Sequence, residues 1–214
     1  MRSFYEIGLS SISDKVISHR YDRFYPRFLD PLRDQSFNML EIGIDQGGSY
    51  EIWKEYFPKA TIYGLDINQE WESYRGKVFK LDQSNPNHLK EVINLVPKCD
   101  FIIDDGSHNP IHQLDTFFEL FENLLNYGGV YIIEDTECSY WRPEFNLYGY
   151  KKGHFNLIDY FKSYPDIVNS MYSQRRNELH ISSITFGQNC IIITKKTQEE
   201  IELTSKVYNL IDRL

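Results

Sequence analysis

The chain has 214 residues, 41% of them apolar, which is enough for one large domain with a well-buried core. Its formal net charge of −8 argues against nucleic acid as a main partner, because phosphate binding needs a basic surface. Cys99, Cys138 and Cys190 have no zinc or disulfide spacing, and no signal segment or membrane-spanning apolar run is present, so we expect a soluble, cytoplasmic protein.

The first half of the chain predicts helices that alternate with strands. Residues 8–36 look helical and polar, with Ser13-Asp14 as a helix cap. Residues 38–44 read as the first buried strand, and Gly47-Gly48-Ser49 opens a helix that runs to about residue 57, just before Pro58. Further strands are expected at 61–66 and 78–82, followed by a helix at 86–96.

The second half continues this alternation and then breaks it. Two short β-branched runs, 101–105 and 130–135, flank a helix-length segment at 111–127 and a Gly128-Gly129 break. Residues 137–178 are rich in Tyr, Phe, Asn and Pro, and we expect a lid or acceptor-binding insertion there. Strands at 181–186 and 190–195 form a hairpin, and residues 201–214 form a final amphipathic helix. The order predicts one α/β domain over 1–214, with a Rossmann-like, mostly parallel central sheet, helices on both faces and a C-terminal antiparallel hairpin.

Both β-branched runs of the second half end in a pair of acids. These pairs are Asp104-Asp105 and Glu134-Asp135, and His108 follows the first pair closely. Because open α/β sheets bind ligands at the carboxyl ends of their strands, these groups should converge on one crevice. Crowded carboxylates need a cation, a proton or a cationic substrate to offset their repulsion. The pattern therefore predicts a site, and a metal ion is the favoured occupant.

The first strand and its turn contain a glycine-rich stretch, Glu41-Ile-Gly43-Ile-Asp-Gln-Gly47-Gly48-Ser49. Glycines let a backbone approach a ligand closely, and the N-terminus of the following helix favours a carboxylate. The spacing differs from the G-x-G-x-x-G of dinucleotide enzymes, and together with the terminal hairpin it resembles the class I methyltransferases that use S-adenosylmethionine.

Acids also stand at the tips of the second and third strands. Asp66 is placed to accept hydrogen bonds from both ribose hydroxyls of a nucleoside, and Asp82-Gln83-Ser84 is placed near an adenine. The alternative is that Gly47-Gly48 is only a turn and that Asp66 only caps a helix.

The acid motifs resemble a narrower family. Asp104-Asp105-Gly-Ser-His108 with Glu134-Asp135, and the upstream Asp14-Lys15 and His19-Arg-Tyr21 segments, are similar to the metal-dependent sugar O-methyltransferases of the mycinamicin and macrocin type. The resemblance covers roughly residues 8–140. It implies that S-adenosylmethionine and Mg²⁺, or another divalent cation, are cofactors.

The resemblance also implies a role for each matching residue. Asp105, Glu134 and Asp135 would hold the cation, and His108 would be the general base. The cofactor would be bound by Lys15, His19, Glu41, Gly43, Gly47, Ser49, Asp66, Asp82, Gln83 and Asp104. The acceptor would be a hydroxyl of a small-molecule sugar, with nucleotide-linked, capsular and antibiotic sugars left open. We expect no membrane partner, and a homo-oligomer stays open.

Other interpretations remain. The same fold could methylate a nitrogen or a catechol-like diol, or bind S-adenosylmethionine without catalysis, whereas a nicotinamide-dependent oxidoreductase is disfavoured by the hairpin. Glu137 could join or replace a metal ligand. Lys151-Lys152 and Arg175-Arg176 are a solvated face or meet a phosphate. The aromatic side chains Tyr140, Trp141, Phe145, Tyr148 and Tyr150 either stack on a sugar or a base, or pack beneath a loop.

Overall fold

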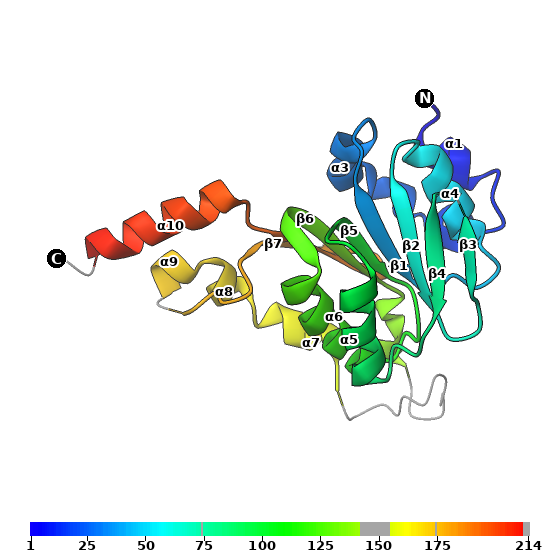
Figure 1. The fold of residues 1–214 in the computed structure, drawn as a ribbon. Helices are drawn as coiled ribbons and strands as arrows, with labels where there is room; N and C mark the ends of the chain where they lie inside the picture. The colour runs from blue at the N-terminus through cyan, green and yellow to red at the C-terminus, as the bar shows by residue number, and fades with distance from the viewer. Residues whose placement is uncertain (74, 142–154, 174, 212–214) are drawn as a thin grey trace.

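A mixed, twisted sheet forms the centre of the protein (Figure 1). The computed structural model describes residues 1–73, 75–141, 155–173 and 175–211, with the backbone alone for 207–211. Within these residues the sheet has eight strands in the order β3-β4-β2-β1-β5-β6-β8-β7. The strands are β1 (Asn38–Ile42), β2 (Thr61–Asp66), β3 (Trp71–Ser73), β4 (Gly76–Lys80), β5 (Cys99–Asp104), β6 (Leu125–Glu134), β7 (Ile181–Gly187) and β8 (Cys190–Lys195).

The strand directions confirm the predicted sheet. Neighbouring strands from β4 through β2, β1 and β5 to β6 run parallel, whereas β8 is antiparallel to both β6 and β7. The register aligns Ile42 with Asp104, and Asp104 with Ile133, so the carboxyl ends of β1, β5 and β6 lie at one edge. The short antiparallel edge strand β3 beside β4 was not predicted from the sequence.

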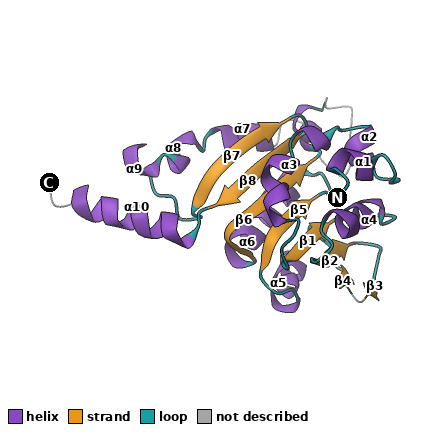
Figure 2. Cartoon of the chain, turned by 90° about the horizontal axis from the view of Figure 1, so that it is seen from above, coloured by secondary structure: helices purple, strands orange, loops and turns teal. Residues whose placement is uncertain are grey.

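Helices cover both faces of the sheet (Figure 2). One aromatic-rich core joins the N-terminal helices and α4 to one face, and a second core joins α5, α6 and α7 to the other. The α-helices are α1 (Phe4–Gly8), α2 (Asp14–Ile17), α3 (Pro26–Leu29), α4 (Gly48–Tyr56), α5 (Pro86–Leu95), α6 (Pro110–Asn123), α7 (Leu157–Lys162), α8 (Pro165–Val168), α9 (Ser170–Ser173) and α10 (Gln198–Ile211), with short 3-10 turns η1 (Tyr21–Arg23), η2 (Asp30–Leu32) and η3 (Thr136–Tyr140). None of these described helices has both the length and the apolar character needed to cross a membrane.

Residues 8–36, which look helical from the sequence, do not form one long helix. The segment is broken into short helices and 3-10 turns, because Pro26 and Pro31 each start a new turn and Arg20 takes a left-handed backbone conformation. Residues 137–178 contain η3, α7, α8 and α9, more helix than expected, although part of this insertion, 142–154, lies outside the described residues. The Gly128-Gly129 break falls within β6 rather than before it, because β6 begins at Leu125.

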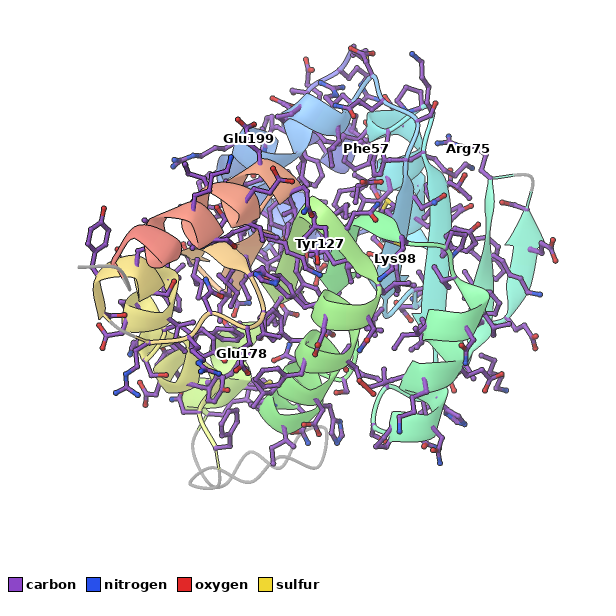
Figure 3. The ribbon with its side chains drawn as sticks, turned by 60° about the vertical axis from the view of Figure 1, so that its left-hand side comes forward. Phe57, Arg75, Lys98, Tyr127, Glu178 and Glu199 are labelled. Carbon is purple, nitrogen blue, oxygen red and sulfur yellow. The ribbon has the colours of Figure 1, made fainter. Side chains whose placement is uncertain are left out.

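The packing of α6 against the sheet depends on a buried lysine. Lys195 of β8 is 6% exposed, and its ammonium donates hydrogen bonds to the carbonyls of Phe121 at 2.7 Å and Leu125 at 3.0 Å. The same ammonium lies 5.2 Å from the ring centre of Tyr127, which Figure 3 labels. Lys195 therefore satisfies carbonyls at the C-terminal end of α6, where a positive charge is favoured by the helix dipole.

Replacing Lys195 with Met should lower the free energy of unfolding by about 2–4 kcal/mol, because it keeps the apolar stem but leaves buried carbonyls without donors. Urea unfolding monitored by circular dichroism measures this loss. Lys196→Met is the matched control, since Lys196 is half-buried and bonds a threonine hydroxyl, and should cost less than about 1 kcal/mol. Equal losses in both variants would refute the capping role.

Candidate functional site

The two acids of the first pair point to opposite faces of the sheet. Asp104 ends β5 on the face of α5 and α6, where it is buried and accepts hydrogen bonds from Gln83 Nε2 at 2.7 Å and from the Gly106 backbone. Burial raises the pKa of Asp104 to about 6. Asp105 follows on the other face, as the two-residue period of a strand requires. Asp104 thus anchors the loop after β5, whereas the side chain of Asp105 faces the opposite side of the sheet.

The opposite face brings three carboxylates onto one lysine. Lys15 of α2 is fully buried, and its Nζ lies 2.6 Å from Asp105 Oδ2, 2.5 Å from Glu134 Oε2 and 3.7 Å from Glu41 Oε1. The Tyr25 hydroxyl donates a hydrogen bond to the other oxygen of Glu134. Lys15 was predicted as a cofactor ligand, yet the structure places its ammonium inside the acid cluster.

One ammonium does not balance these acids. Burial alone would lower the pKa of Lys15, but the charges of Asp105, Glu134 and Glu41 more than reverse this, and the pKa lies above its ordinary value. Burial raises the pKa of Glu41 to about 7, and burial with the charge of Asp105 raises that of Glu134. Burial is thus the main cause of the raised carboxylate pKa values, and the geometry itself places three carboxylates on a single ammonium.

Beside this buried group lies a partly exposed one, formed by Asp105, His108 and Asp135, which we call the open group. One ligand atom from each of Asp105, His108 and Asp135 lies within 4.8 Å of the other two, and His108 Nε2 is 3.7 Å from Asp135 Oδ2. Both His108 and Asp135 have positive φ angles, 52° and 53°, which is strained for non-glycine residues. Burial and the charge of Asp105 raise the pKa of Asp135. Two carboxylates and an imidazole at this spacing can hold a divalent cation.

A residue of the hairpin turn fixes Asp135. Asn189 Nδ2 donates to Asp135 Oδ1 at 2.9 Å, and Asn189 Oδ1 accepts the backbone N–H of Glu137 at 2.8 Å. The Tyr21 hydroxyl donates to the same Asp135 oxygen at 2.8 Å. Asn189 itself has a φ of 62°, a backbone conformation that Asn tolerates better than most residues. The turn between β7 and β8 is therefore part of the site.

The open group lines a cavity of about 650 Å³ that extends over the turn after β1. The wall of this cavity includes three of the predicted cofactor residues, Gly43, Ser49 and Asp66, as well as Asp105, His108 and Asp135. The carboxylate of Asp66 accepts four backbone N–H groups, those of Ile44, Asp45, Asn68 and Gln69. Although burial opposes it, these donors hold the pKa of Asp66 below its ordinary value. Asp66 thus holds the loop after β1 and the loop after β2 together. Its binding of the ribose hydroxyls of the cofactor stays a prediction.

Two other cavities are lined in part by predicted site residues. A cavity of about 350 Å³ shares Gly43 and Asp66 with it and is lined by the predicted residues Asp82 and Gln83. On the side of the insertion, a cavity of about 640 Å³ is lined by residues of four segments. These are Ser18, His19, Thr136, Glu137, Tyr140, Ile158, Lys162, Phe186, Gly187, Gln188 and Asn189.

The sequence prediction grouped more residues than the structure brings together. The open group contains Asp105, His108 and Asp135, whereas Glu134, predicted as the third metal ligand, faces Lys15 and Tyr25. Of the predicted cofactor residues, Lys15, Glu41 and Asp104 are buried, His19 lines the insertion-side cavity, and Gly47 lines a separate cavity beside Tyr50 and Trp71. All these roles stay predictions.

Two residues of the site were missed. Tyr25 stands four residues after Tyr21, a helical spacing that could have placed both rings together, and they stack with ring centres 5.1 Å apart. Asn189 stands in the predicted hairpin turn, where a positive φ is common, but its contact to Asp135 spans 54 residues and has no local signal.

Comparisons with known proteins identify similar chains. No protein-family model matches this chain. It is 36% identical over 144 residues to an 8-demethyl-8-alpha-L-rhamnosyl tetracenomycin-C 2'-O-methyltransferase of Streptomyces olivaceus, and 37% identical over 132 residues to an L-olivosyl-oleandolide 3-O-methyltransferase of Streptomyces antibioticus. These matches cover 63% and 58% of this chain, but this chain spans only 38% and 34% of the relatives' lengths.

The solved structure of the MycE methyltransferase from the mycinamycin biosynthetic pathway, in complex with Mg and SAH, has the same fold. The match has a TM-score of 0.80 at 26% sequence identity and covers 93% of this chain and 56% of the MycE chain. The comparisons confirm the class I methyltransferase fold and the resemblance to sugar O-methyltransferases.

Replacing Asn189 with Gly should weaken divalent cation binding by about tenfold, because Asp135 loses a fixing hydrogen bond while the positive φ is still tolerated. Calorimetric titration with Mg²⁺ or Mn²⁺ measures the affinity. Gln188→Ala serves as the control, since the neighbouring Gln188 bonds Arg23 rather than the acids. An unchanged affinity in Asn189→Gly would show that Asn189 does not position Asp135 for a cation.

Proposed function

We propose that this chain is an S-adenosylmethionine-dependent O-methyltransferase that requires a divalent cation, preferably Mg²⁺, and methylates a hydroxyl of a sugar. The observation that carries the proposal is that the open acid–imidazole group lines one cavity, while the residues that follow Asp135 in the chain line a second one. Asp135 lines the cavity over the glycine-rich turn, and the next residues, Thr136 and Glu137, line the cavity on the insertion side. Two reactants can therefore meet at this group, one from each side.

The charge and chemistry of the cluster fit a divalent cation. Three acids, Glu41, Asp105 and Glu134, lie within 4 Å of one ammonium, and Asp135 lies in the adjoining group with Asp105 and His108. These four carboxylates outnumber the single ammonium that contacts them. Carboxylate oxygens are the donors that Mg²⁺ prefers. We propose Asp105 and Asp135 as its ligands. Glu134 would join them only by releasing Lys15.

The cavity over the glycine-rich turn fits S-adenosylmethionine. Gly43 has a φ of 85°, and a Cβ at this position would lie 2.1 Å from the backbone oxygen of Asp105, so only glycine lets the β1 and β5 loops approach. Ser49 lies in the first turn of α4, whose N-terminus favours a carboxylate. The smaller cavity beside Asp82 and Gln83 is proposed for the adenine, as the sequence predicted.

The chain's own residues would supply the proton transfer and the alignment. When bound, the two cofactors supply an electrophilic methyl group and a positive charge that lowers the pKa of a sugar hydroxyl. His108 Nε2 would take the hydroxyl proton, and Asp135, 3.7 Å away, would stabilise the resulting imidazolium. The two cavity walls would hold the acceptor oxygen in line with the methyl group and exclude water.

The insertion-side cavity is the proposed acceptor site, as the sequence predicted for 137–178. Its wall alternates polar groups such as Glu137 and Asn189 with the apolar surfaces of Tyr140 and Phe186, which suits the hydroxyls and faces of a sugar. Lys162 is the one lysine or arginine among its described lining residues, and Asp159 pairs with it at 3.0 Å. The lining therefore supports a neutral sugar more than a diphosphate. Lys151-Lys152, for which the sequence left a solvated face or a phosphate contact open, lies outside the described residues.

The names of the relatives support a sugar acceptor carried on a larger small molecule. Those enzymes are named for methylation of sugars linked to tetracenomycin and oleandolide. Because this chain spans about a third of their lengths, the identity of its own acceptor is a proposal. We propose that residues 1–214 act as one methyltransferase domain.

His108→Gln should lower turnover by at least about a hundredfold while cation affinity changes less than about threefold, because the variant loses the base and keeps both carboxylates. Methyl transfer to sugar acceptors and calorimetry with Mg²⁺ provide the two readouts. His180→Gln is the control, because His180 lines none of the four cavities described above. A parallel loss of cation affinity in His108→Gln would make His108 a metal ligand instead of the base.

Gly43→Ala should weaken S-adenosylmethionine binding by at least about tenfold, because the new methyl group forces the β1 and β5 loops apart. Calorimetric titration with S-adenosylmethionine and, separately, with NAD tests both the variant and the proposed cofactor. The unaltered protein should bind S-adenosylmethionine alone. Binding of NAD instead would overturn the methyltransferase proposal.

A further inference from the structure

Lys15 is the centre of a charge arrangement that the proposed reaction does not use. Its ammonium is fully buried and reaches the cluster from α2, which lies far from the acids in sequence. It contacts Asp105 at 2.6 Å and Glu134 at 2.5 Å, and no other lysine or arginine among the described residues forms an ion pair with either acid. A buried ammonium in contact with two carboxylates is strongly held, and its removal leaves buried charge uncompensated.

The open group shares one of its acids with this buried group. Asp105 Oδ2 binds Lys15, while a carboxylate oxygen of Asp105 also belongs to the group with His108 and Asp135. Lys15 and a divalent cation therefore act on the same carboxylate. Because like charges at this range repel, each lowers the affinity of the site for the other.

We propose that Lys15 is a built-in counter-ion that holds the acid cluster together without the divalent cation and that weakens cation binding, so that the cation remains exchangeable. The inference rests on the cation site of the proposed function. Lys15 is a positioning residue: it orients Asp105 and Glu134 and need not touch either reactant. Tyr25, which donates to the second oxygen of Glu134, assists by fixing that carboxylate against the ammonium.

The test compares Lys15→Met, which keeps the stem and removes the charge, with Lys15→Arg and with the exposed control Lys59→Met. Thermal unfolding is measured in EDTA and in Mg²⁺, and Mg²⁺ affinity is measured by calorimetry. In EDTA, Lys15→Met should melt about 10 °C below the unaltered protein, because a buried pair has lost one partner. Its Mg²⁺ affinity should rise by at least about tenfold, so that Mg²⁺ restores most of the lost melting temperature.

The other variants separate charge from shape. Lys15→Arg should retain cation affinity within about threefold, and Lys59→Met should leave both readouts unchanged. The double variant Lys15→Met with Glu134→Gln removes one positive and one negative charge together, and should recover at least half of the melting temperature lost in EDTA. Where Lys15→Met alone does not fold, recovery in the double variant decides for the counter-ion and its absence decides against it.

A failure of the Lys15 inference can be told apart from a failure of the proposed cation site. If the unaltered protein binds Mg²⁺ but Lys15→Met binds it no more tightly, the counter-ion inference is wrong and the proposed cation site stands. If neither the unaltered protein nor any variant binds Mg²⁺ or Mn²⁺, the cation site itself is wrong and both proposals fall.

Discussion

The two-residue period of the central strands is the constraint on which the site depends. It sends Asp104 to the face of α5 and α6, where Gln83 binds it, and sends Asp105 to the face of the N-terminal helices. Glu41 and Glu134 stand on that same second face, so their strands deliver three carboxylates to one buried point. A one-residue shift in the register of β1, β5 or β6 would turn the acid of that strand to the opposite face and separate it from the others.

The open part of the site is created where this alternation stops. Asp135 leaves β6 with a positive φ, and its side chain turns toward Asp105 and His108 instead of the opposite face. Such a conformation is retained only where neighbours over-determine it, and Tyr21 and Asn189 supply the hydrogen bonds. The site thus combines a rigid buried half, fixed by strand geometry, with an outer half fixed by side chains from distant segments.

Sequence reasoning succeeded where the signal is local. Strands β1, β2, β4, β5, β6, β7 and β8 were found because each contains a short run of β-branched or apolar residues. The acids at the ends of the parallel strands β2, β5 and β6 come to one edge because of the parallel geometry. It failed over 8–36, where proline and left-handed turns override a polar helical pattern. It could not separate Glu134 from Asp135, because the partners that distinguish them, Lys15, Tyr25 and Asn189, lie 54 to 119 residues away along the chain.

The position of β8 also determines when the site can form during synthesis. β8 lies between β6 and β7 in the sheet, so β6 gains its second neighbour only from the last strand to be synthesised. Asp135 emerges from the ribosome 54 residues ahead of Asn189, the side chain that holds it. A nascent chain that has completed all of the parallel strands still has an exposed strand edge at β6, and its Asp135 still lacks the hydrogen bond from Asn189. The complete set of hydrogen bonds to Asp135 therefore requires that the hairpin has packed against β6.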